Sequence, residues 1–236
     1  MRRESLEREK RELLERLKRE GVVKSERIAR AFLKVPRELF VPPRLAARAY
    51  QDIPLPIGYG QTISAPHMVL IMTERLDPRE GDKILEVGTG SGYQAALLAE
   101  LVDPTGSGPG HVYTIERLPE LAERARRNLE RAGYADRVTV IVGDGSLGYP
   151  ESAPYDGIIV TAAAPKIPEP LKRQLKIGGR IVAPVGDLFS QVLYVGVKVS
   201  ESELELREDV PCVFVPLIGK EGWPEEIVES DSGYVT

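Results

Sequence analysis

The spacing of apolar residues changes near residue 80 of this 236-residue chain. Before that point, Leu6, Leu13, Leu14 and Leu17 stand at helical intervals among Arg, Lys and Glu, which predicts an amphipathic helix over residues 3–20. After it, short apolar runs such as "DKILEVG", "GHVYTIE" and "YDGIIVTAAA" alternate with longer segments of helical periodicity. Runs that are apolar at consecutive positions are typical of parallel strands covered on both faces.

The alternation breaks near the C-terminus, where "QVLYVGVKVS" and "ELELREDVPCVFVPLIG" follow each other without a helix between them. At least one of these closing strands is therefore expected to run antiparallel. We predict an α/β fold in a single domain, with a doubly wound, mostly parallel seven-stranded sheet, N-terminal helices and an antiparallel C-terminal strand. Residues 36–63, rich in proline and glycine, are expected to be irregular.

A glycine-rich loop, "EVGTGSG", follows the first strand of the sheet and places glycines at positions 88, 90 and 92. Such a loop lets the backbone approach a ligand closely, although it can also be no more than a tight turn. The dinucleotide fingerprint requires a third glycine where this chain has Tyr93, which argues against a nicotinamide-dependent oxidoreductase. The spacing, with Glu86 before it, instead resembles the first motif of the S-adenosylmethionine-dependent methyltransferases.

Two more acidic residues end the next strands of the predicted sheet. Glu116 ends the second strand, where a carboxylate can accept both ribose hydroxyls of a nucleoside. Asp144 ends the third strand, where it could accept the adenine amino group. Either acid alone could be a solvated strand end. The ordered series after the glycine loop favours a site for S-adenosylmethionine.

The segment after the fourth strand, "TAAAP", restricts the methyl acceptor because it is small and apolar. Enzymes that methylate the exocyclic amines of bases commonly carry Asn or Asp, two prolines and an aromatic residue there. This chain also has no evident His, Lys or Tyr placed as a general base. An acceptor that is already ionised, such as a carboxylate, needs none and has only to be aligned and desolvated.

The stretch "GQTISAPHM", together with "ILEVGTGSGY", "YDGIIVTAAAP", "GGRIVAPVG" and "VFVPLIG", resembles the protein-L-isoaspartate (D-aspartate) O-methyltransferases over about residues 25–220. The resemblance implies methyl transfer from S-adenosylmethionine to the free α-carboxylate of L-isoaspartyl, and possible D-aspartyl, residues in damaged proteins. The methyl ester then reverts through a succinimide. The alternatives are an S-adenosylmethionine-dependent O-methyltransferase of a small carboxylic acid and a catalytically silent binding module.

The resemblance also implies roles for individual residues. It makes residues 1–80 a helical and substrate-cleft segment, 81–200 the cofactor-binding core, and 201–236 the closing strand and tail. Ser64 would orient the acceptor carboxylate, although it could instead cap a helix that begins near Pro66. The implied cofactor-binding residues are Gln61, Thr62, Ile63, Glu86, Gly88, Gly90, Gly92, Glu116, Arg117, Asp144 and Gly145. The implied substrate-binding residues are Ile63, Ser64, Val213 and Val215.

Composition narrows the possible partners and surroundings. The net charge is −4 and the pI about 5.5, so no general basic field is present to bind nucleic acid. One cysteine and two histidines predict no disulfide and no metal site, and they fit a reducing cytoplasm. No apolar run is long enough to cross a membrane, and no segment resembles a signal peptide. The scarcity of Asn and Cys suggests a heat-adapted protein, and we expect a monomer in the cytoplasm.

Overall fold

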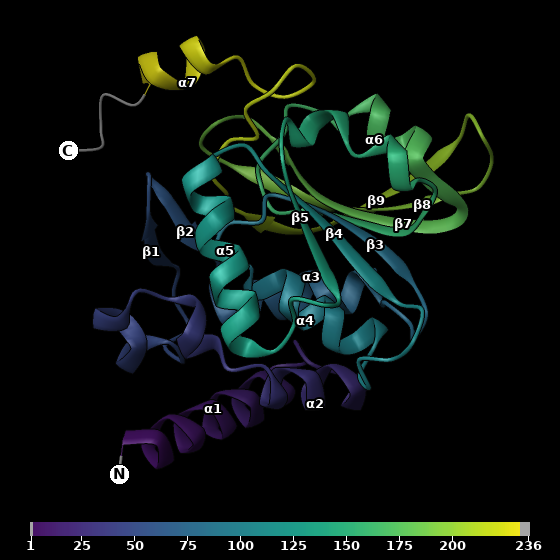
Figure 1. The fold of residues 1–236 in the computed structure, drawn as a ribbon. Helices are drawn as coiled ribbons and strands as arrows, with labels where there is room; N and C mark the ends of the chain where they lie inside the picture. Colours follow the sequence, from purple (N-terminus) through teal and green to yellow (C-terminus); the bar gives the residue numbers. More distant parts are fainter. Residues whose placement is uncertain (1, 232–236) are drawn as a thin grey trace.

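The computed structural model describes residues 2–231 and contains a seven-stranded sheet in the order β5-β4-β3-β6-β7-β8-β9 (Figure 1). Its strands are β3 (Lys83–Val87), β4 (His111–Glu116), β5 (Val138–Val142), β6 (Tyr155–Val160), β7 (Leu175–Gly186), β8 (Gln191–Lys198) and β9 (Leu204–Cys212). The first five strands pair in parallel, whereas β8 is antiparallel to both β7 and β9. The predicted mostly parallel sheet with an antiparallel strand near its C-terminal edge is confirmed.

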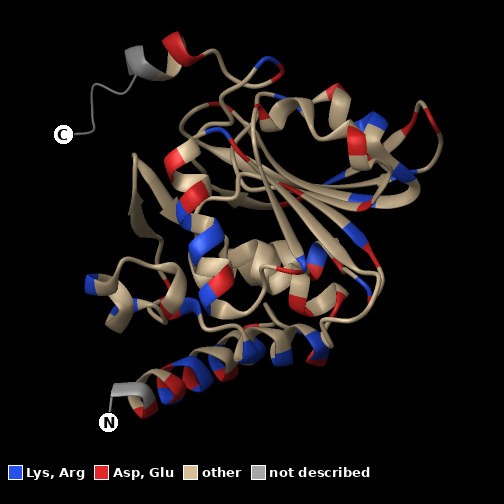
Figure 2. Ribbon diagram, in the orientation of Figure 1, with Lys and Arg blue, Asp and Glu red and all other residues tan. Residues whose placement is uncertain are grey.

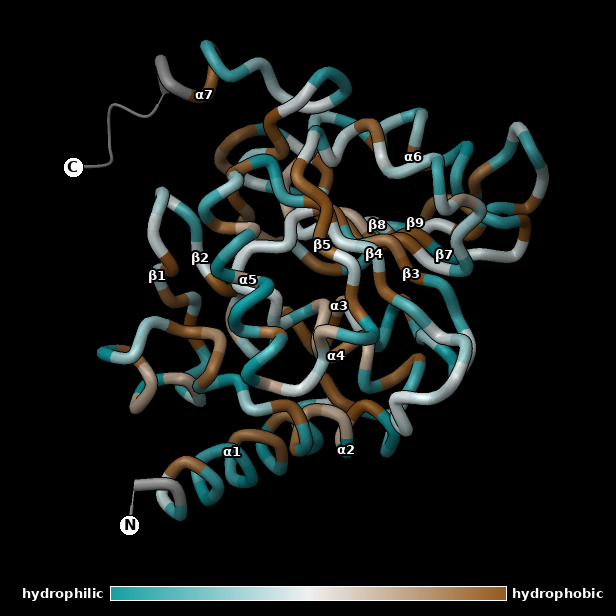
Figure 3. Tube along the Cα trace, in the orientation of Figure 1, coloured by the Kyte–Doolittle hydropathy of each residue, from teal (hydrophilic) through white to brown (hydrophobic). Residues whose placement is uncertain are grey.

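Helices cover both faces of this sheet. The helices are α1 (Arg2–Arg19), α2 (Glu26–Lys34), α3 (Pro66–Leu76), α4 (Tyr93–Val102), α5 (Pro119–Ala132), α6 (Glu169–Gln174) and α7 (Glu225–Asp231). Along β3, Ile84 packs into the cluster that contains α2, α3, α4 and α5, whereas Leu85 packs into the cluster that contains α6. Figure 3 shows these strands as the hydrophobic centre of the molecule. Because both strand faces are buried, the strands carry apolar residues at successive positions.

The N-terminal helix α1 packs along the outside of this layered core, as its pattern of leucines predicts. Leu13, Leu14 and Leu17 are buried in the same cluster as Ile28 and Phe32 of α2. Most charged positions of α1 are at least partly exposed, although Lys10 is buried, and Figure 2 shows both signs of charge mixed along the helix. Among residues 2–231, no helix is long and apolar enough to cross a membrane.

The expectation that residues 36–63 are irregular is wrong in part. They contain two short 3-10 helices, η1 (Arg37–Phe40) and η2 (Pro43–Arg48), and an antiparallel hairpin of β1 (Leu55–Gly58) and β2 (Gln61–Ile63). The hairpin turns through Gly58, Tyr59 and Gly60, which all have positive φ. Strands of three and four residues are too short to show a period of two in the sequence, so the pattern did not reveal them.

The C-terminal part differs from expectation in where its elements end. The closing strand β9 ends at Cys212, and "VFVPLIG" continues as a separate segment across the carboxyl ends of the parallel strands. Isolated bridges join Pro216 to Ala163 and Trp223 to Ile218. Residues 232–236 of the predicted tail lie outside the described residues. Two short 3-10 turns, η3 (Gly145–Leu147) and η4 (Pro150–Ser152), follow β5.

Candidate active site

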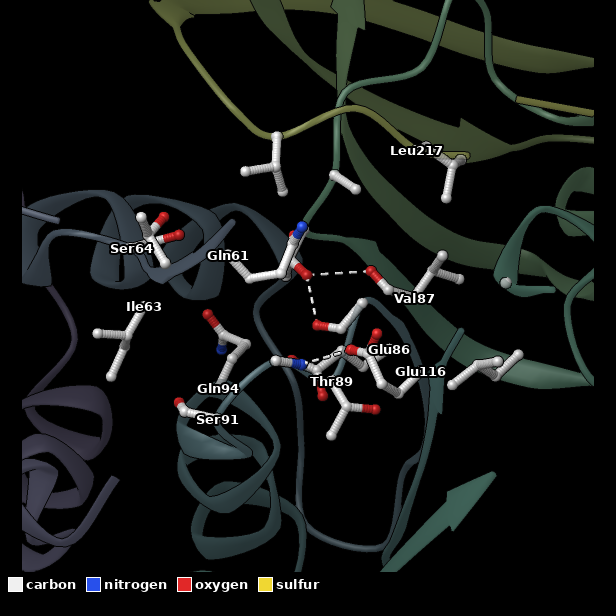
Figure 4. A pocket seen from close by; sticks show the side chains of 18 of the residues that line it. Gln61, Ile63, Ser64, Glu86, Val87, Thr89, Ser91, Gln94, Glu116 and Leu217 are labelled. Atoms are coloured by element: carbon white, nitrogen blue, oxygen red, sulfur yellow. Dashed lines mark hydrogen bonds between the residues drawn. The ribbon is translucent and has the colours of Figure 1, made fainter. Parts of the chain in front are cut away.

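A cavity opens at the carboxyl ends of β3, β4 and β6, where ligands of open α/β sheets bind. One wall consists of these strand ends and the glycine loop, and the other of the β1–β2 hairpin and the start of α3 (Figure 4). The segment after β9 adds Val215, Pro216, Leu217 and Ile218. We call the wall of strand ends and glycine loop the strand-end wall, and the wall of the β1–β2 hairpin and the start of α3 the hairpin wall. They differ in how they are held in place.

Gly88, at the end of β3, holds the glycine loop against β6. It has a φ of 98°, and a Cβ atom there would lie 2.5 Å from the Thr161 hydroxyl oxygen. The Thr161 hydroxyl donates to the carbonyl of Gly88 at 2.6 Å. No larger residue fits this position without moving the loop, so the backbone itself forms the cavity wall here.

Glu116 joins the glycine loop to the end of β4. Its carboxylate accepts hydrogen bonds from the backbone N–H of Gly90 at 2.9 Å and of Leu118 at 3.1 Å. A carboxylate has about four lone-pair positions, so both oxygens can still accept from a ligand. Glu116 lines the cavity, and this geometry suits the two hydroxyls of a ribose.

Glu86 lies beside Glu116 in the same wall and is completely buried (Figure 4). The Thr114 hydroxyl lies 2.6 Å from Glu86 Oε2, but Glu86 Oε1 has no hydrogen-bond partner among the described residues. Burial raises the pKa of Glu86 to about 8, although the bond from Thr114 lowers it, and the charge of Glu116 adds to the rise. An unpartnered buried carboxyl oxygen fits a ligand with a positively charged or N–H group. S-adenosylmethionine carries a sulfonium and an ammonium.

Ser64 lies in the hairpin wall, opposite the glycine loop (Figure 4). The alternative that it caps a helix is wrong, because Ala65 is the N-cap of α3 and the side chain that accepts from the first turn of that helix is Asp52. The Ser64 hydroxyl has no hydrogen-bond partner among residues 2–231, whereas its backbone carbonyl accepts from Arg37 at 2.7 Å. The main chain at Ser64 is therefore fixed while its hydroxyl remains available to a ligand.

Arg37 is a buried arginine that fixes the hairpin wall. Its Nη2 donates to the carbonyl of Ser64 at 2.7 Å and its Nε to the carbonyl of Ala49 at 2.8 Å. The guanidinium lies 5.0 Å from the ring centre of Tyr93, a residue of the cavity wall. Burial lowers the pKa of Arg37 to about 10, so the group stays charged at neutral pH. Nothing in the sequence distinguishes Arg37 from a solvated arginine.

A polar cluster of Asp52, His67 and Arg16 anchors the start of α3. Asp52 Oδ1 lies 2.9 Å from both the backbone nitrogen and the Nδ1 of His67, and Asp52 Oδ2 lies 2.9 Å from Arg16 Nη2. The bond to Asp52 raises the pKa of His67. Burial would raise the pKa of Asp52, but the bonds from His67 and Arg16 lower it to about 2. His67 therefore has an anchoring role.

The structure brings most of the sequence-predicted site residues together around one cavity. Those in its wall are Gln61, Thr62, Ile63, Ser64, Glu86, Gly88, Gly90, Glu116, Arg117, Gly145 and Val215. Three others lie outside the wall. Gly92 is the N-cap of α4, and Val213 is exposed to solvent. The carboxylate of Asp144 accepts from the Ser146 backbone and hydroxyl and from the Lys220 backbone, at 2.6–2.9 Å.

Sequence reasoning missed several wall residues that come from α3, α4 and the ends of β3 and β6. They include Val69, Met72, Thr89, Ser91, Tyr93, Gln94 and Thr161. Gln94 donates to the Thr73 hydroxyl at 3.0 Å, which orients its amide within the wall. In the sequence the four positions on α3 and α4 have the periodicity of helix core, whereas Thr89 and Ser91 lie within the glycine loop and Thr161 directly follows β6. No cluster of His, Cys, Asp and Glu suited to a metal occurs within the described part of the chain.

Comparison with known sequences agrees with this geometry. A relative from Hyperthermus butylicus, named protein-L-isoaspartate O-methyltransferase, is 65% identical over 92% of this chain and 91% of its own. One of the same name from Staphylothermus marinus is 58% identical over 94% of this chain and 100% of its own. Both organisms are thermophilic archaea, in agreement with the expected heat adaptation.

Comparison with solved structures leads to the same family. A Plasmodium falciparum protein described as a protein-L-isoaspartate O-methyltransferase, in complex with S-adenosyl-L-homocysteine, superposes with a TM-score of 0.79 at 27% identity and covers 89% of this chain and 98% of its own. Another structure of that name has a TM-score of 0.79 at 33% identity, over 90% of this chain and 67% of its own. The model of the protein-L-isoaspartate(D-aspartate) O-methyltransferase family matches residues 8–222, and the chain belongs to this family.

Proposed function

We propose that this cavity methylates the free α-carboxylate of L-isoaspartyl residues, with Ser64 aligning the acceptor. The observation that carries the proposal is the unpartnered hydroxyl of Ser64, held across one cavity from the glycine loop and Glu116. S-adenosylmethionine, the cofactor of this family, supplies a methyl carbon that is electrophilic because it is bonded to a sulfonium sulfur. The strand-end wall is the side of the cavity that is suited to hold this cofactor.

The reaction requires alignment and no proton transfer from the acceptor. An α-carboxylate is ionised at neutral pH, so its oxygen can attack without a general base. The new bond joins that oxygen to the methyl carbon, and the electron pair of the broken carbon–sulfur bond stays on sulfur. The Ser64 hydroxyl donates a hydrogen bond to the other carboxylate oxygen and so holds the nucleophile in line. This role agrees with the lack of a base beside Ser64.

Residues of the strand-end wall divide the work of binding the cofactor. Glu116 accepts the ribose hydroxyls. The free oxygen of Glu86 accepts from the ammonium of the cofactor, whose positive charge favours the ionised form of this carboxyl. Gly88 and Gly90 let the cofactor approach the backbone, and Gly92 supports the loop from below as the N-cap of α4. Gln61, Thr62 and Ile63 close the site from the hairpin wall, and Arg117 and Gly145 line the outer end of the cavity.

Asp144 holds the adenine end of the site indirectly. Its carboxylate already accepts three hydrogen bonds, from Ser146 and Lys220, and it lies behind the cavity wall. We assign it to the support of the turn at Gly145 and of the segment at Lys220. This is a weaker role than direct recognition of the adenine amino group.

The client peptide binds across Ile63, Ser64 and the segment at Val213 and Val215. Val215 lines the cavity, and Val213 is 75% exposed two residues before it, so both can contact an extended chain that lies on this segment. Main-chain recognition would accept many flanking sequences. The relatives' name specifies a protein acceptor, which favours this activity over methylation of a small carboxylic acid. D-aspartyl acceptance, the monomeric state, the cytoplasmic location and the division at residues 80 and 200 stay predictions.

Labelled S-adenosylmethionine tests the proposed activity directly. The chain is incubated with a peptide that contains one L-isoaspartyl residue and, separately, with the same peptide containing normal aspartate. Label is expected in the isoaspartyl peptide alone, in a form that is lost at alkaline pH as expected of a methyl ester. Equal labelling of both peptides, or of neither, would rule the activity out.

Two variants separate the proposed roles of the walls. Ser64→Ala should lower kcat at least about tenfold, because about one hydrogen bond in the transition state is lost, and should leave affinity for S-adenosylhomocysteine unchanged. Ser64→Thr, which keeps the hydroxyl, is the matched control. Glu116→Ala should first lower the affinity for the cofactor. Full activity of Ser64→Ala would remove Ser64 from the mechanism.

A further inference from the structure

A second hollow lies outside the active site, between η1, η2, the end of β1 and α5. Four arginines line it, namely Arg44, Arg124, Arg127 and Arg131, and we call this hollow the arginine groove. Its apolar floor comes from Phe40, Val41 and Ile57. No aspartate or glutamate lines the groove, although the whole chain carries a net charge of −4.

The positive charges of the arginine groove are poorly compensated. The side chains of Arg44 and Arg131 have no ion pair or hydrogen bond to any other residue that the structure describes. Arg127 pairs only with Glu123, at 3.1 Å, and both side chains are exposed. Arg124 donates to the carbonyl of Ile57. Exposed ion pairs of this kind contribute little, so the groove keeps a positive potential.

Helix α5 aligns three of these arginines toward the groove. Arg124, Arg127 and Arg131 are spaced by three and four residues, so they lie on one face of the helix. Figure 2 shows basic residues along the middle and lower part of α5, with acidic residues in its first turns and one more near its end. Arg126 lies on another face and donates to the carbonyl of Val140 at 2.8 Å. A row of guanidinium groups can bind carboxylates in paired hydrogen bonds.

The arginine groove and the active site share a boundary. Ser91 lines both hollows, and the β1–β2 hairpin separates them. Ile57 and Gly58 of β1 face the groove, whereas Gln61, Thr62 and Ile63 of β2 line the active site. Paired strands lie about 5 Å apart, so the hairpin is a narrow divide. A peptide with its reacting residue at Ser64 can continue over the hairpin into the groove.

We propose that the arginine groove binds acidic side chains that flank the isoaspartyl residue in the client protein. The proposal rests on the function proposed above and adds a sequence preference to it. Carboxylates of Asp or Glu would pair with Arg44, Arg127 and Arg131, while the stems of those side chains contact the apolar floor at Phe40 and Ile57. Clients with acidic segments would be bound more tightly, and neutral clients would be methylated without this help.

Matched peptides test the preference. Each peptide carries one isoaspartyl residue, with three glutamates or three glutamines placed on its N-terminal or its C-terminal side. At saturating S-adenosylmethionine and low salt, the wild type should give a KM about tenfold lower for one of the glutamate peptides, and added salt should reduce the difference. The double variant Arg127→Gln with Arg131→Gln should remove the preference and leave the KM of glutamine peptides unchanged.

Arg126→Gln is the control for loss of positive charge from the same helix, because it removes one such charge outside the groove. It should keep the preference for glutamate. Equal KM values for glutamate and glutamine peptides in the wild type would overturn the proposal. So would a loss of the glutamate preference in Arg126→Gln as large as that in the double variant. A competition experiment tests for nucleic acid. If an RNA oligonucleotide displaces a bound glutamate peptide at a lower concentration than an unlabelled glutamate peptide does, the proposal is overturned in favour of nucleic acid.

Glutamine peptides keep the two proposals distinguishable. If the wild type methylates them and shows no preference for glutamate, the groove proposal fails while the proposed function stands. If no isoaspartyl peptide is methylated, the proposed function fails and the groove proposal falls with it. The four arginines that are replaced or assigned to carboxylates, Arg44, Arg126, Arg127 and Arg131, are exposed, so the variants are expected to fold.

Discussion

The strand-end wall and the hairpin wall of the active site are built on different physical principles. The strand-end wall follows from the sheet, since β3, β4 and β6 end at one edge and glycine allows the loop at Gly88 to turn. The hairpin wall consists of short elements that are held by charged groups from elsewhere, namely Arg37 and the cluster of Asp52, His67 and Arg16. One wall depends on backbone geometry, and the other on long-range polar contacts.

Because of this difference, cofactor binding and client binding depend on different kinds of structural support. The strand-end wall, suited to a cofactor of fixed shape, is continuous with the buried core of the sheet. The hairpin wall, which we propose to meet clients of many sequences, can be weakened without breaking the sheet. Substitutions in the two walls should therefore have different signatures, and the following variants are ordered from the largest expected effect to the smallest.

Gly88→Ala should have the largest effect, because its Cβ would lie 2.5 Å from the Thr161 hydroxyl and its φ of 98° disfavours any side chain. We expect a loss of about 3 kcal/mol in the free energy of unfolding and no detectable cofactor binding. Gly133→Ala is the control, since Gly133 also has positive φ but open space around it. It should cost about 1 kcal/mol. Similar losses, measured by denaturant unfolding, would contradict a steric role for Gly88.

Arg37→Met should reveal the dependence of the hairpin wall on a buried charge. It removes the donors to the carbonyls of Ser64 and Ala49, and we expect a cost of about 2–4 kcal/mol with a higher KM for isoaspartyl peptides. Affinity for S-adenosylhomocysteine should change less than the peptide KM. Arg48→Met, which loses only a bond to Gln51 at the surface, should cost less than about 0.5 kcal/mol. If both variants behave alike, Arg37 does not hold the wall.

Glu86→Gln should change how stability depends on pH. In the unfolded chain this carboxyl has its ordinary pKa of 4.5, whereas burial raises the folded value to about 8. Between these values the native state holds a proton that the unfolded state has lost, so stability falls as pH rises, by about 1.4 kcal/mol per unit of pKa difference. Glu86→Gln should flatten this slope in unfolding titrations. Glu120→Gln, at an exposed position, should leave the slope unchanged. An unchanged slope in Glu86→Gln would refute the raised pKa assigned to Glu86.

His67→Ala should have the smallest effect, about 1 kcal/mol, because the ring is partly exposed. The pKa of His67 is raised, so its contribution is complete below about 6.5 and is lost as pH rises through the higher folded value. The pKa of Asp52 is lowered to about 2, so its contribution is lost only in strong acid. The difference from wild type should be greatest between about pH 4 and 6.5.

His111→Ala provides a control of opposite sign for this last prediction. Burial lowers the pKa of His111, so the native state resists its protonation and loses stability as pH falls below about 6.5. Replacing His111 should therefore reduce the loss of stability in acid, while replacing His67 should increase it. The two pH profiles are compared by chemical denaturation at constant ionic strength. Parallel profiles would show that neither histidine has the environment described.

The sequence revealed the strand-end wall and left the hairpin wall largely hidden. Strands β3, β4 and β6 are apolar at successive positions, and the spacing of Gly88, Gly90 and Gly92 is a local signal. The hairpin has strands too short for periodicity. Its anchor, Arg37, is in sequence an ordinary arginine whose burial depends on Tyr93 and Ala49, residues brought to it only by the fold. Long-range polar contacts leave no pattern in a single sequence.

The hydrogen bonds of Asp144 have a further consequence for the lifetime of the protein. Aspartate followed by glycine is prone to the very damage that this family is named for, since the next backbone nitrogen can attack the side-chain carbonyl carbon. At Asp144 both carboxylate oxygens are occupied by donors from Ser146 and Lys220, and Gly145 lies buried in η3. Ring closure requires the Gly145 nitrogen to reach the side-chain carbon of Asp144, so this hydrogen-bonded turn would have to rearrange. The turn that shapes the active site thus also shields this Asp-Gly pair from ageing.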